Sequence, residues 1–293
     1  MYFLNKFKNK NVIITGHTGF KGSWLAVWLN SLGANVIGIS NNIPTCPSNF
    51  EASNIKKNIK EYRVDITDRK KIINIIKKIN PDFVFNLAAQ SLVRRSYEFP
   101  ADTFLTNAIG SINILEAVRL NNKKTNCIMI TSDKVYLNKE LKRGYIENDT
   151  IMGKDPYSGS KSMAEIAIYS YVQSFFLNSP IRVVTARAGN VIGGGDWAED
   201  RIVPDSIKAW SKNKEVILRN PNSTRPWQHV LEPLSGYLLL GVLMDDKPEL
   251  NGKSYNFGPP DKNDFSVKVL IERMSNYWPN SSWKIKNLKN KSI

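Results

Sequence analysis

The chain has 293 residues, 42% hydrophobic and 23% charged, which excludes a disordered or fibrous protein and allows one large domain, alone or with a smaller lobe. Its formal net charge is +15, but the lysines are scattered, which argues against a nucleic-acid partner and leaves either a general lysine bias or a field that attracts an anionic small substrate. Two distant cysteines and two histidines exclude a disulfide framework and a metal site with the usual ligand spacing.

The chain opens on a short polar and basic lead, followed by a strand predicted over residues 12–15. The lead lacks the apolar core and small-residue cleavage site of a signal peptide. The longest apolar run further on, residues 237–244, is too short to span a bilayer. These features predict a cytoplasmic protein with no membrane partner.

Short β-branched runs alternate with longer helical patterns through the first two thirds of the chain. Strands connected by crossover helices form a parallel sheet, and the helices are long enough to cover both of its faces. The pattern therefore predicts an α/β fold, a Rossmann-like doubly wound parallel sheet. The predicted strands are residues 12–15, 35–39, 62–65, 83–88, 127–131 and 182–187, and the predicted helices are residues 21–31, 68–79, 101–120 and 157–176.

Beyond about residue 189 the pattern changes to clusters of Gly, Pro, Asp and Trp, with short helical pieces at residues 201–210 and 234–244. We expect a smaller C-terminal lobe that binds the substrate. The predicted domains are residues 1–188, which bind the cofactor, and residues 189–293. No linker or hinge separates them, so we expect them to be intertwined.

A glycine-rich turn connects the first predicted strand to the first predicted helix. Gly16, Gly19 and Gly22 give a tight turn, let backbone N–H groups approach a diphosphate, and place the positive end of the helix dipole next to it. Their spacing differs from the standard G-x-G-x-x-G and resembles that of short-chain dehydrogenases. An ordinary strand-to-helix turn is the alternative interpretation.

Ribose recognition is left open by the second strand. Neither an acid nor an arginine follows it, since the chain continues with Ser40, Asn41 and Asn42. An acid there would bind the ribose hydroxyls of NAD, and an arginine would favour the phosphate of NADP.

Tyr157 and Lys161 form a Y-x-x-x-K pair within the fourth predicted helix. The spacing of four residues places both side chains on one helix face. A phenol loses its proton near pH 10, so it needs a nearby cation such as Lys161 to act as a base near neutrality. The pair predicts an oxidoreductase-type proton transfer.

Long strings of the sequence resemble one family over nearly the whole chain. With the Tyr/Lys pair they resemble extended short-chain dehydrogenases/reductases of the NAD-dependent epimerase/dehydratase type. Lys134 stands where dehydratases acting on dTDP-glucose or GDP-mannose carry Glu, and the resulting Ser-Asp-Lys order is similar to the CDP-glucose 4,6-dehydratases. The strings are TGHTGFKGSWL (15–25), NLAAQSLVRRSY (86–97), RAGNVIGGGDW (187–197), DRIVPD (200–205) and RNPNSTRPWQHVLEP (219–233).

The resemblance implies an NAD-dependent hydro-lyase that converts CDP-glucose to CDP-4-keto-6-deoxyglucose for deoxysugar and surface lipopolysaccharide biosynthesis. It also implies a homo-oligomer, a dimer or a tetramer. Members of the family continue for several tens of residues beyond the point where this chain ends in a basic tail. We therefore expect the C-terminal lobe to be incomplete.

The implied catalytic residues follow the fifth predicted strand and begin the fourth predicted helix. Oxidation at sugar C4 makes the C5 proton acidic, and loss of water across C5 and C6 then needs a base and an acid. Asp133 is the candidate acid, while Lys134 is either a neutral base or a cation that stabilises the enolate. The catalytic set is Ser132, Asp133, Lys134, Tyr157 and Lys161.

The implied NAD contacts all lie in the first predicted domain, and most of the implied substrate contacts lie in the second. Guanidinium groups of the C-terminal lobe suit a substrate diphosphate because each presents a fork of donors. For NAD the resemblance implies Gly16, Thr18, Gly19, Phe20, Gly22, Asp65, Ile66, Ala88, Ala89, Gln90, Asn107, Tyr157 and Lys161. For the nucleotide sugar it implies Arg95, Ser96, Asn190, Arg201, Arg219, Arg225 and His229.

Two alternatives stay open. A nucleotide-sugar epimerase, or a dehydratase acting on another nucleotide, shares the glycine turn and the Tyr/Lys pair. A non-enzymatic nucleotide sensor or RNA-binding protein would use the same lobe without the chemistry.

Overall fold

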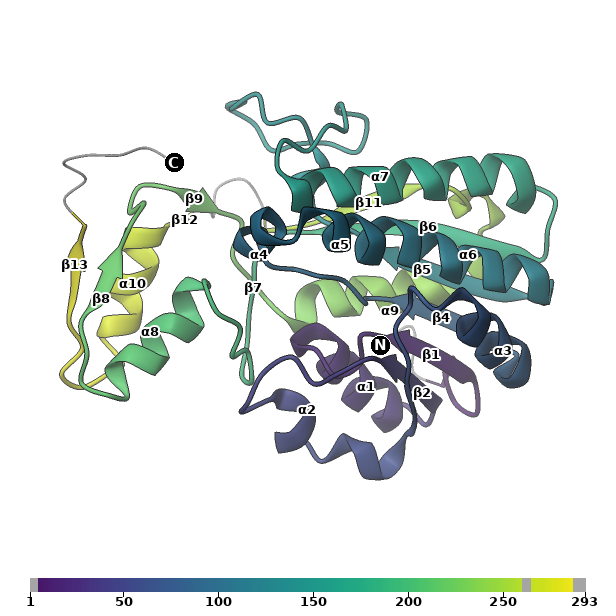
Figure 1. The fold of residues 1–293 in the computed structure, drawn as a ribbon, viewed down its shortest axis with the longest axis horizontal. Coiled ribbons are helices and arrows are strands. Elements are labelled where there is room, and N and C mark those ends of the chain that lie inside the picture. The colour runs from purple at the N-terminus through teal and green to yellow at the C-terminus, as the bar shows by residue number, and fades with distance from the viewer. Residues whose placement is uncertain (1–4, 260–264, 287–293) are drawn as a thin grey trace.

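The computed structural model describes residues 5–259 and 265–286 of the chain. At its centre is a seven-stranded sheet in which all neighbouring strands are parallel, in the order β11-β6-β5-β4-β1-β2-β3 (Figure 1). The predicted α/β doubly wound sheet is thus confirmed. Its strands are β1 (Asn11–Thr15), β2 (Asn35–Ser40), β3 (Lys60–Arg63), β4 (Phe83–Asn86), β5 (Thr125–Ile130), β6 (Ile181–Ala188) and β11 (Ser254–Phe257).

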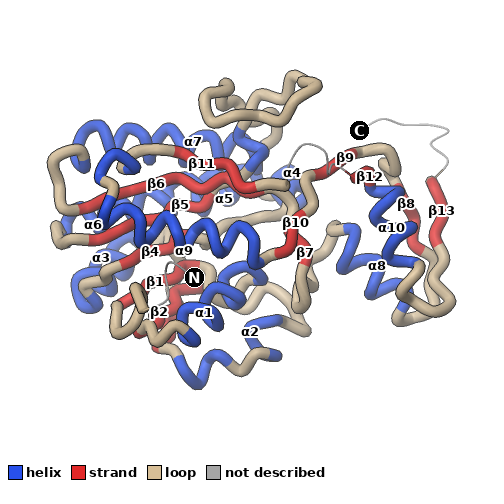
Figure 2. Tube along the Cα trace, turned by 180° about the vertical axis from the view of Figure 1, so that it is seen from behind, coloured by secondary structure: helices blue, strands red, loops and turns tan. Residues whose placement is uncertain are grey.

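Helices cover both faces of this sheet (Figure 2). Each face has its own apolar core. Alternate residues of a strand point to opposite faces, so Val12 and Ile14 belong to one core and Ile13 to the other. Helices α1 (Phe20–Ser31) and α9 (Leu231–Asp246) pack on the first face. Helices α3 (Arg69–Ile79), α6 (Gly110–Asn121) and α7 (Pro156–Tyr171) pack on the second.

All six predicted strands are present, with bounds that differ by one or two residues from the prediction, and the third and fourth show the reason most clearly. The third lies at Lys60–Arg63, because these residues pair in register with Ile37–Ser40 of β2. The fourth ends at Asn86 instead of residue 88, because the chain then turns toward β1: the N–H of Ala88 donates to Thr15 Oγ1 at 3.1 Å.

The predicted helices are also present, and two of them change geometry along their length. Residues 101–120 divide into α5 (Pro100–Phe104), the π-helical turn η2 (Leu105–Ile109) and α6, while α7 ends in a second π-helical turn, η4 (Val172–Phe176). Shorter helical segments are α2 (Asn49–Ala52), α4 (Val93–Glu98), η1 (Ile55–Asn58), η3 (Asp133–Val135) and η5 (Pro248–Leu250).

A small lobe lies beyond the carboxyl edge of the sheet (Figure 1). Its own core contains Trp210, Val216, Leu218 and Ile271. The lobe contains α8 (Ile202–Trp210), α10 (Val267–Ser275) and the pairs β8 (Val216–Leu218) with β13 (Trp283–Ile285) and β9 (Thr224–Arg225) with β12 (Phe265–Ser266). A further pair, β7 (Val191–Ile192) with β10 (Gln228–His229), lies where the chain passes between lobe and sheet.

The chain beyond residue 189 also returns to the sheet. Helix α9 covers one face, and β11, a strand that the sequence did not predict, pairs with β6 at the edge. The division into domains 1–188 and 189–293 stays a prediction. Helix α9 and strand β11 belong to the second predicted domain by sequence and pack on the sheet of the first.

No helix in the described part of the chain is long and apolar enough to cross a lipid bilayer. Within the same residues, no group of three or more His, Cys, Asp and Glu side chains could hold a metal ion. Of the basic tail, Lys284 belongs to β13, whereas residues 287–293 lie outside the described residues.

Candidate active site

The glycine turn between β1 and α1 is tightly packed against the end of β4. Gly16 has a φ of +73°, and a Cβ atom there would stand 2.8 Å from the backbone N of Ala88. A Cβ at Gly22 would collide with the carbonyl oxygen of Gly16. Gly19 caps α1 without a side-chain hydrogen bond, so backbone N–H groups of the first turn are left for an anionic ligand.

Thr18 and Phe20 fasten this turn to its surroundings. Thr18 is buried, and its Oγ1 donates to the carbonyl of Asn42, just after β2, at 2.7 Å. The ring of Phe20 packs against Gly193, where an added Cβ would lie 3.2 Å from Cζ. Both side chains shape the turn on which a cofactor would lie.

A carboxylate reaches the end of β2 from another part of the chain. Asn41, the first residue after β2, donates from Nδ2 to Asp65 Oδ2 at 2.7 Å, and the N–H of Thr67 donates to Oδ1 at 2.9 Å. The adjacent Ile66 is buried against Gly110. Asp65, a predicted cofactor residue, thus lies next to the end of β2, where the sequence has no acid, and its contact with Asn41 is one that sequence reasoning missed.

The segment after β4 is held by a pair of amides. Ala88 and Ala89 lead to Gln90, whose N–H donates to Asn107 Oδ1 at 2.8 Å and whose carbonyl accepts from Asn107 Nδ2 at 3.0 Å. Asn107 is fully buried and also donates to Ser160 of α7 at 2.9 Å. Asn107 therefore ties the segment after β4 to helix α7 through its buried side chain.

A short turn after β5 brings three predicted catalytic side chains together. Ser132 Oγ donates to Asp133 Oδ1 at 3.1 Å and accepts from the N–H of Lys134. Lys134 Nζ donates to the same Asp133 oxygen at 3.2 Å. The charge of Asp133 is the largest cause that raises the pKa of Lys134, and Tyr157 adds to it, so this lysine is held as a cation.

Tyr157 and Lys161 lie in the first two turns of α7, whose N-terminus is capped by Asp155. Both side chains are buried. Lys161 Nζ donates to the carbonyl of Ile130, the last residue of β5, at 3.3 Å, and burial lowers its pKa to about 8. The helix thus places the predicted base and its cation next to the β5 turn.

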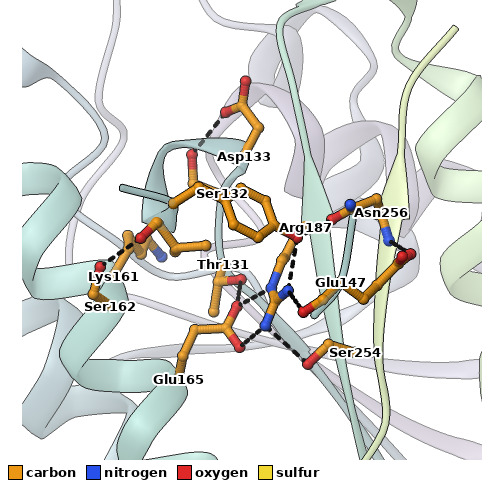
Figure 3. Close-up of polar contacts among 12 residues, drawn as sticks. Thr131, Ser132, Asp133, Glu147, Lys161, Ser162, Glu165, Arg187, Ser254 and Asn256 are labelled. Carbon is orange, nitrogen blue, oxygen red and sulfur yellow. Dashed lines mark hydrogen bonds and ion pairs between the residues drawn. The ribbon is translucent and has the colours of Figure 1, made fainter. Parts of the chain in front are cut away.

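A buried ion pair lies directly beneath this turn (Figure 3). Arg187 of β6 donates from Nε and Nη2 to the two carboxylate oxygens of Glu165, at 2.8 and 3.0 Å. Thr131, next to Ser132, donates to Glu165 Oε1 at 2.5 Å. Arg187 also donates to Tyr136 Oη and to Ser254 Oγ of β11. Sequence reasoning missed this pair, although Glu165 follows Lys161 by one helical turn.

The three predicted substrate arginines differ in their surroundings. Arg201 pairs with Asp196 at 2.9 Å, and Arg225 is exposed, with its charge acting on Lys134. Arg219 instead pairs at 3.0 Å with Asp200, which also binds Arg94 at 2.8 Å. Arg201 and Arg219 are thus each paired with a carboxylate, whereas the charge of Arg225 acts on Lys134 in the catalytic turn.

Lys21, in the first turn of α1, is a second cation that the sequence analysis missed. Burial is the largest cause that lowers its pKa to about 8, and the charges of Arg201, Lys134 and Lys161 contribute to the same shift against the opposite effect of Asp133. It therefore belongs to the same group of charges, in which Arg201, Lys134 and Lys161 act on it against Asp133, while Asp196 pairs with Arg201. The position of Lys21 within the glycine turn was the sequence feature that could have indicated its place in the site.

The other predicted substrate residues have structural contacts. Ser96 is fully buried, donates to the carbonyl of Val93 at 2.7 Å and accepts from the N–H of Tyr157 at 3.1 Å, so it supports α7. The Arg95 guanidinium lies 5.7 Å from the ring centroid of Phe99. Two residues lie near β10: Asn190, whose buried Oδ1 has no partner among the described residues, and His229, which is edge-on to Trp24.

A family model described as GDP-mannose 4,6 dehydratase matches residues 13–265. A CDP-glucose 4,6-dehydratase from Salmonella typhimurium is 43% identical over 285 residues, covering 95% of this chain and 79% of the relative. A UDP-glucose 4-epimerase from Mycoplasma genitalium is 26% identical over 267 residues, covering 84% of this chain and 76% of the relative.

Solved structures share the fold at low identity. A UDP-glucose 4-epimerase from Thermotoga maritima, crystallised with UDP-glucose, has a TM-score of 0.80 at 22% identity, covering 95% of this chain and 87% of the other. A dTDP-glucose 4,6-dehydratase from Streptomyces venezuelae, crystallised with NAD, has a TM-score of 0.78 at 17% identity, covering 94% and 84%.

Proposed function

The chain belongs to the GDP-mannose 4,6-dehydratase family, and on that premise we propose that it is an NAD-dependent hydro-lyase that converts CDP-glucose to CDP-4-keto-6-deoxyglucose. The observation that carries the proposal is the turn after β5, where Asp133 and Lys134 share one charged site with Tyr157. The product suits deoxysugar and surface lipopolysaccharide biosynthesis.

The residues of the first domain fit a dinucleotide. The Gly16 and Gly22 positions have no room for a side chain, so backbone can approach a diphosphate at the uncapped start of α1. Asp65, held by Asn41 at the end of β2, would bind the adenosine portion. NAD held by these residues would supply a reversible hydride acceptor for the sugar, so it would not be consumed.

In the oxidation half, Tyr157 removes the proton from the sugar C4 hydroxyl. Lys161 lies one helical turn further along α7 and supplies positive charge on the same helix face. Ser132, which already donates to Asp133, orients the same hydroxyl. Ser96 and Asn107 act behind these groups by holding α7 and the segment after β4.

In the elimination half, a water molecule or another group takes the C5 proton, and Asp133, which has to be protonated for this step, donates a proton to the hydroxyl that leaves C6 as water. Between the two roles that the sequence left open for Lys134, the raised pKa favours the cation. A charged lysine cannot accept the C5 proton, so Lys134 stabilises the developing enolate. The negative charge that forms is thus met by a fixed positive one.

The excess of cations around Asp133 supports an anionic substrate. Arg201, Arg225 and Lys21 share the field of the catalytic turn, which suits the diphosphate of a nucleotide sugar. Asn190 offers a buried carbonyl oxygen that a substrate group can satisfy. The preference for the cytidine nucleotide rests on the Salmonella typhimurium relative.

We also propose that the protein works in the cytoplasm, where NAD and nucleotide sugars are made.

We propose further that the protein forms a homodimer. Helix α7 exposes an apolar stripe: Met163 is 41% exposed, Ile166 61% and Tyr169 62%. Such a stripe is expected to pack against another copy. Light scattering should then show a dimer that Ile166→Lys converts to a monomer, and a monomeric wild-type protein would contradict the proposal.

Turnover of CDP-, dTDP-, GDP- and UDP-linked glucose or mannose by the purified protein with NAD tests the substrate. We expect CDP-glucose to have the highest kcat/KM and Tyr157→Phe to lose about 10²-fold or more of it. A preference for another nucleotide would remove the CDP assignment and keep the dehydratase.

The epimerase alternative shares the fold and the Tyr/Lys pair, so the fate of a label must separate the two. With deuterium at sugar C4, a dehydratase moves the label to C6 of a 4-keto product and releases water. Recovery of a C4 epimer without loss of water would overturn the proposed reaction.

A further inference from the structure

The hydroxyl of Tyr237 is a buried polar group without a partner. Tyr237 lies on α9 and is fully buried, and its oxygen has no hydrogen bond to any described residue. Its ring packs edge-on against Phe257, with the centroids 5.3 Å apart. The ring contact with Phe257 does not involve the hydroxyl, and nearly all buried polar groups in proteins are hydrogen-bonded. The unsatisfied hydroxyl therefore calls for a functional explanation.

Tyr237 lies at the strand ends that carry the catalytic acid. Phe257, its ring partner, is the last residue of β11 and pairs with Ala188 of β6. Gly189, which follows Ala188 in the chain, donates its N–H to the carbonyl of Phe257. A Cβ atom at Gly189 would stand 3.3 Å from Asp133 Oδ2. Tyr237 and Asp133 thus flank the same pair of strand ends.

The electrostatics support this placement. Burial raises the pKa of Tyr237, and the negative charges of Asp133 and ionised Tyr157 raise it further, so the hydroxyl lies in the field of both. Both hydrogen bonds that Asp133 accepts from the described chain end on Oδ1, one from Ser132 and one from Lys134. Oδ2 is left without a donor.

We propose that Tyr237 is a positioning residue for the dehydration step: its hydroxyl donates a hydrogen bond to Asp133 Oδ2 across one buried water. The terminal torsion of an aspartate is broad, so two donors on one oxygen leave the carboxyl group free to turn. A donor on the second oxygen fixes the carboxyl toward the leaving hydroxyl. This inference rests on the proposed function, since it acts through the proposed general acid.

Tyr237→Phe tests the inference, because it removes the hydroxyl and keeps the ring. We expect kcat for CDP-glucose to fall about tenfold, with KM and the Kd of NAD unchanged within twofold. The melting temperature should stay the same or rise, because an unsatisfied buried group is lost. Tyr62→Phe is the matched control: its hydroxyl is also buried without a partner, but on β3 at the far edge of the sheet, so kcat should not change.

A double-mutant cycle shows whether Tyr237 acts through Asp133. In an Asp133→Asn background, Tyr237→Phe should cost less than twofold in residual kcat. An unchanged kcat in the single variant, or a loss that accompanies a lower melting temperature, would overturn the inference. If the wild-type protein prefers another nucleotide sugar, only the substrate proposal fails, and the same comparison on that substrate still decides the role of Tyr237.

Discussion

Replacing Glu165 with glutamine should test how far the buried ion pair supports the catalytic turn. The side chains of Arg187 and Glu165 are only 3% and 4% exposed, so the guanidinium left behind could not recover its hydration. The amide keeps the shape of the carboxylate but loses its charge. It also turns an NH₂ group toward a donor, either Thr131 Oγ1 or an Arg187 nitrogen.

The size of the effect follows from that burial. Removing one partner of a buried ion pair costs about 3–5 kcal/mol, whereas an exposed pair is worth about 0–1 kcal/mol. For a chain of this length the larger value corresponds to a fall in melting temperature of roughly 10 °C. Glu272→Gln is the matched control, because Glu272 pairs with Lys268 on α10 with both side chains nearly half exposed.

Thermal and urea unfolding of the two variants provide the comparison. We expect a large loss for Glu165→Gln and none beyond about 0.5 kcal/mol for Glu272→Gln. The double variant Glu165→Gln/Arg187→Met should recover part of the loss, because it removes the uncompensated charge. Equal stabilities for Glu165→Gln and Glu272→Gln would refute the reasoning, and so would a double variant less stable than Glu165→Gln alone.

Three further predictions concern the glycine turn, Ser96 and Lys161. Gly16→Ala should weaken NAD binding, measured by calorimetry, and lower the melting temperature, because Gly16 has a φ of +73° and no room for a Cβ atom. Gly194→Ala is the control and should change neither quantity, because a Cβ atom there has nothing within 4 Å. Equal effects of the two substitutions would contradict this prediction. Ser96→Ala should lower kcat more than it raises KM, because its hydroxyl accepts from the N–H of Tyr157; a change in KM alone would favour a substrate contact. Burial lowers the pKa of Lys161 from 10.5 to about 8. Between pH 8 and pH 10.5 the unfolded chain therefore binds more protons than the folded protein. The free energy of unfolding should rise with pH in this range, by up to about 1.4 kcal/mol per pH unit. Urea titrations from pH 7 to 10 should show a smaller rise for Lys161→Met, and an identical rise would show that Lys161 is not responsible.

The sequence by itself determined the architecture and the local parts of the site. Apolar runs such as that of β5 are buried on both faces, and each is followed by polar residues at the carboxyl edge, so the position of the Ser132–Lys134 turn could be predicted. The glycine turn and the Tyr157/Lys161 pair were equally accessible. Each depends on a strand-to-helix boundary or on a spacing of one helical turn, which a short window of sequence encodes.

Only the tertiary structure decided which distant side chains meet. Glu165 and Arg187 lie on different elements, as do Asn41 and Asp65, and no local pattern predicts either contact. The same holds for Arg219, which pairs with Asp200 in the lobe. Such pairings depend on how the elements pack against each other. The apolar faces determine that packing, but their sequence pattern does not indicate which polar side chains meet at the edges of the packed elements.

The return of the chain to the sheet was likewise decided by packing. The strand β11 has only four residues, Ser254–Phe257, with no long β-branched run, so its own sequence gives little signal. It becomes a strand because β6 offers it an open edge. Helix α9 then carries Tyr237 to the catalytic strand ends, and nothing in the spacing of Tyr237 from Asp133 along the chain could have indicated that they lie so near each other.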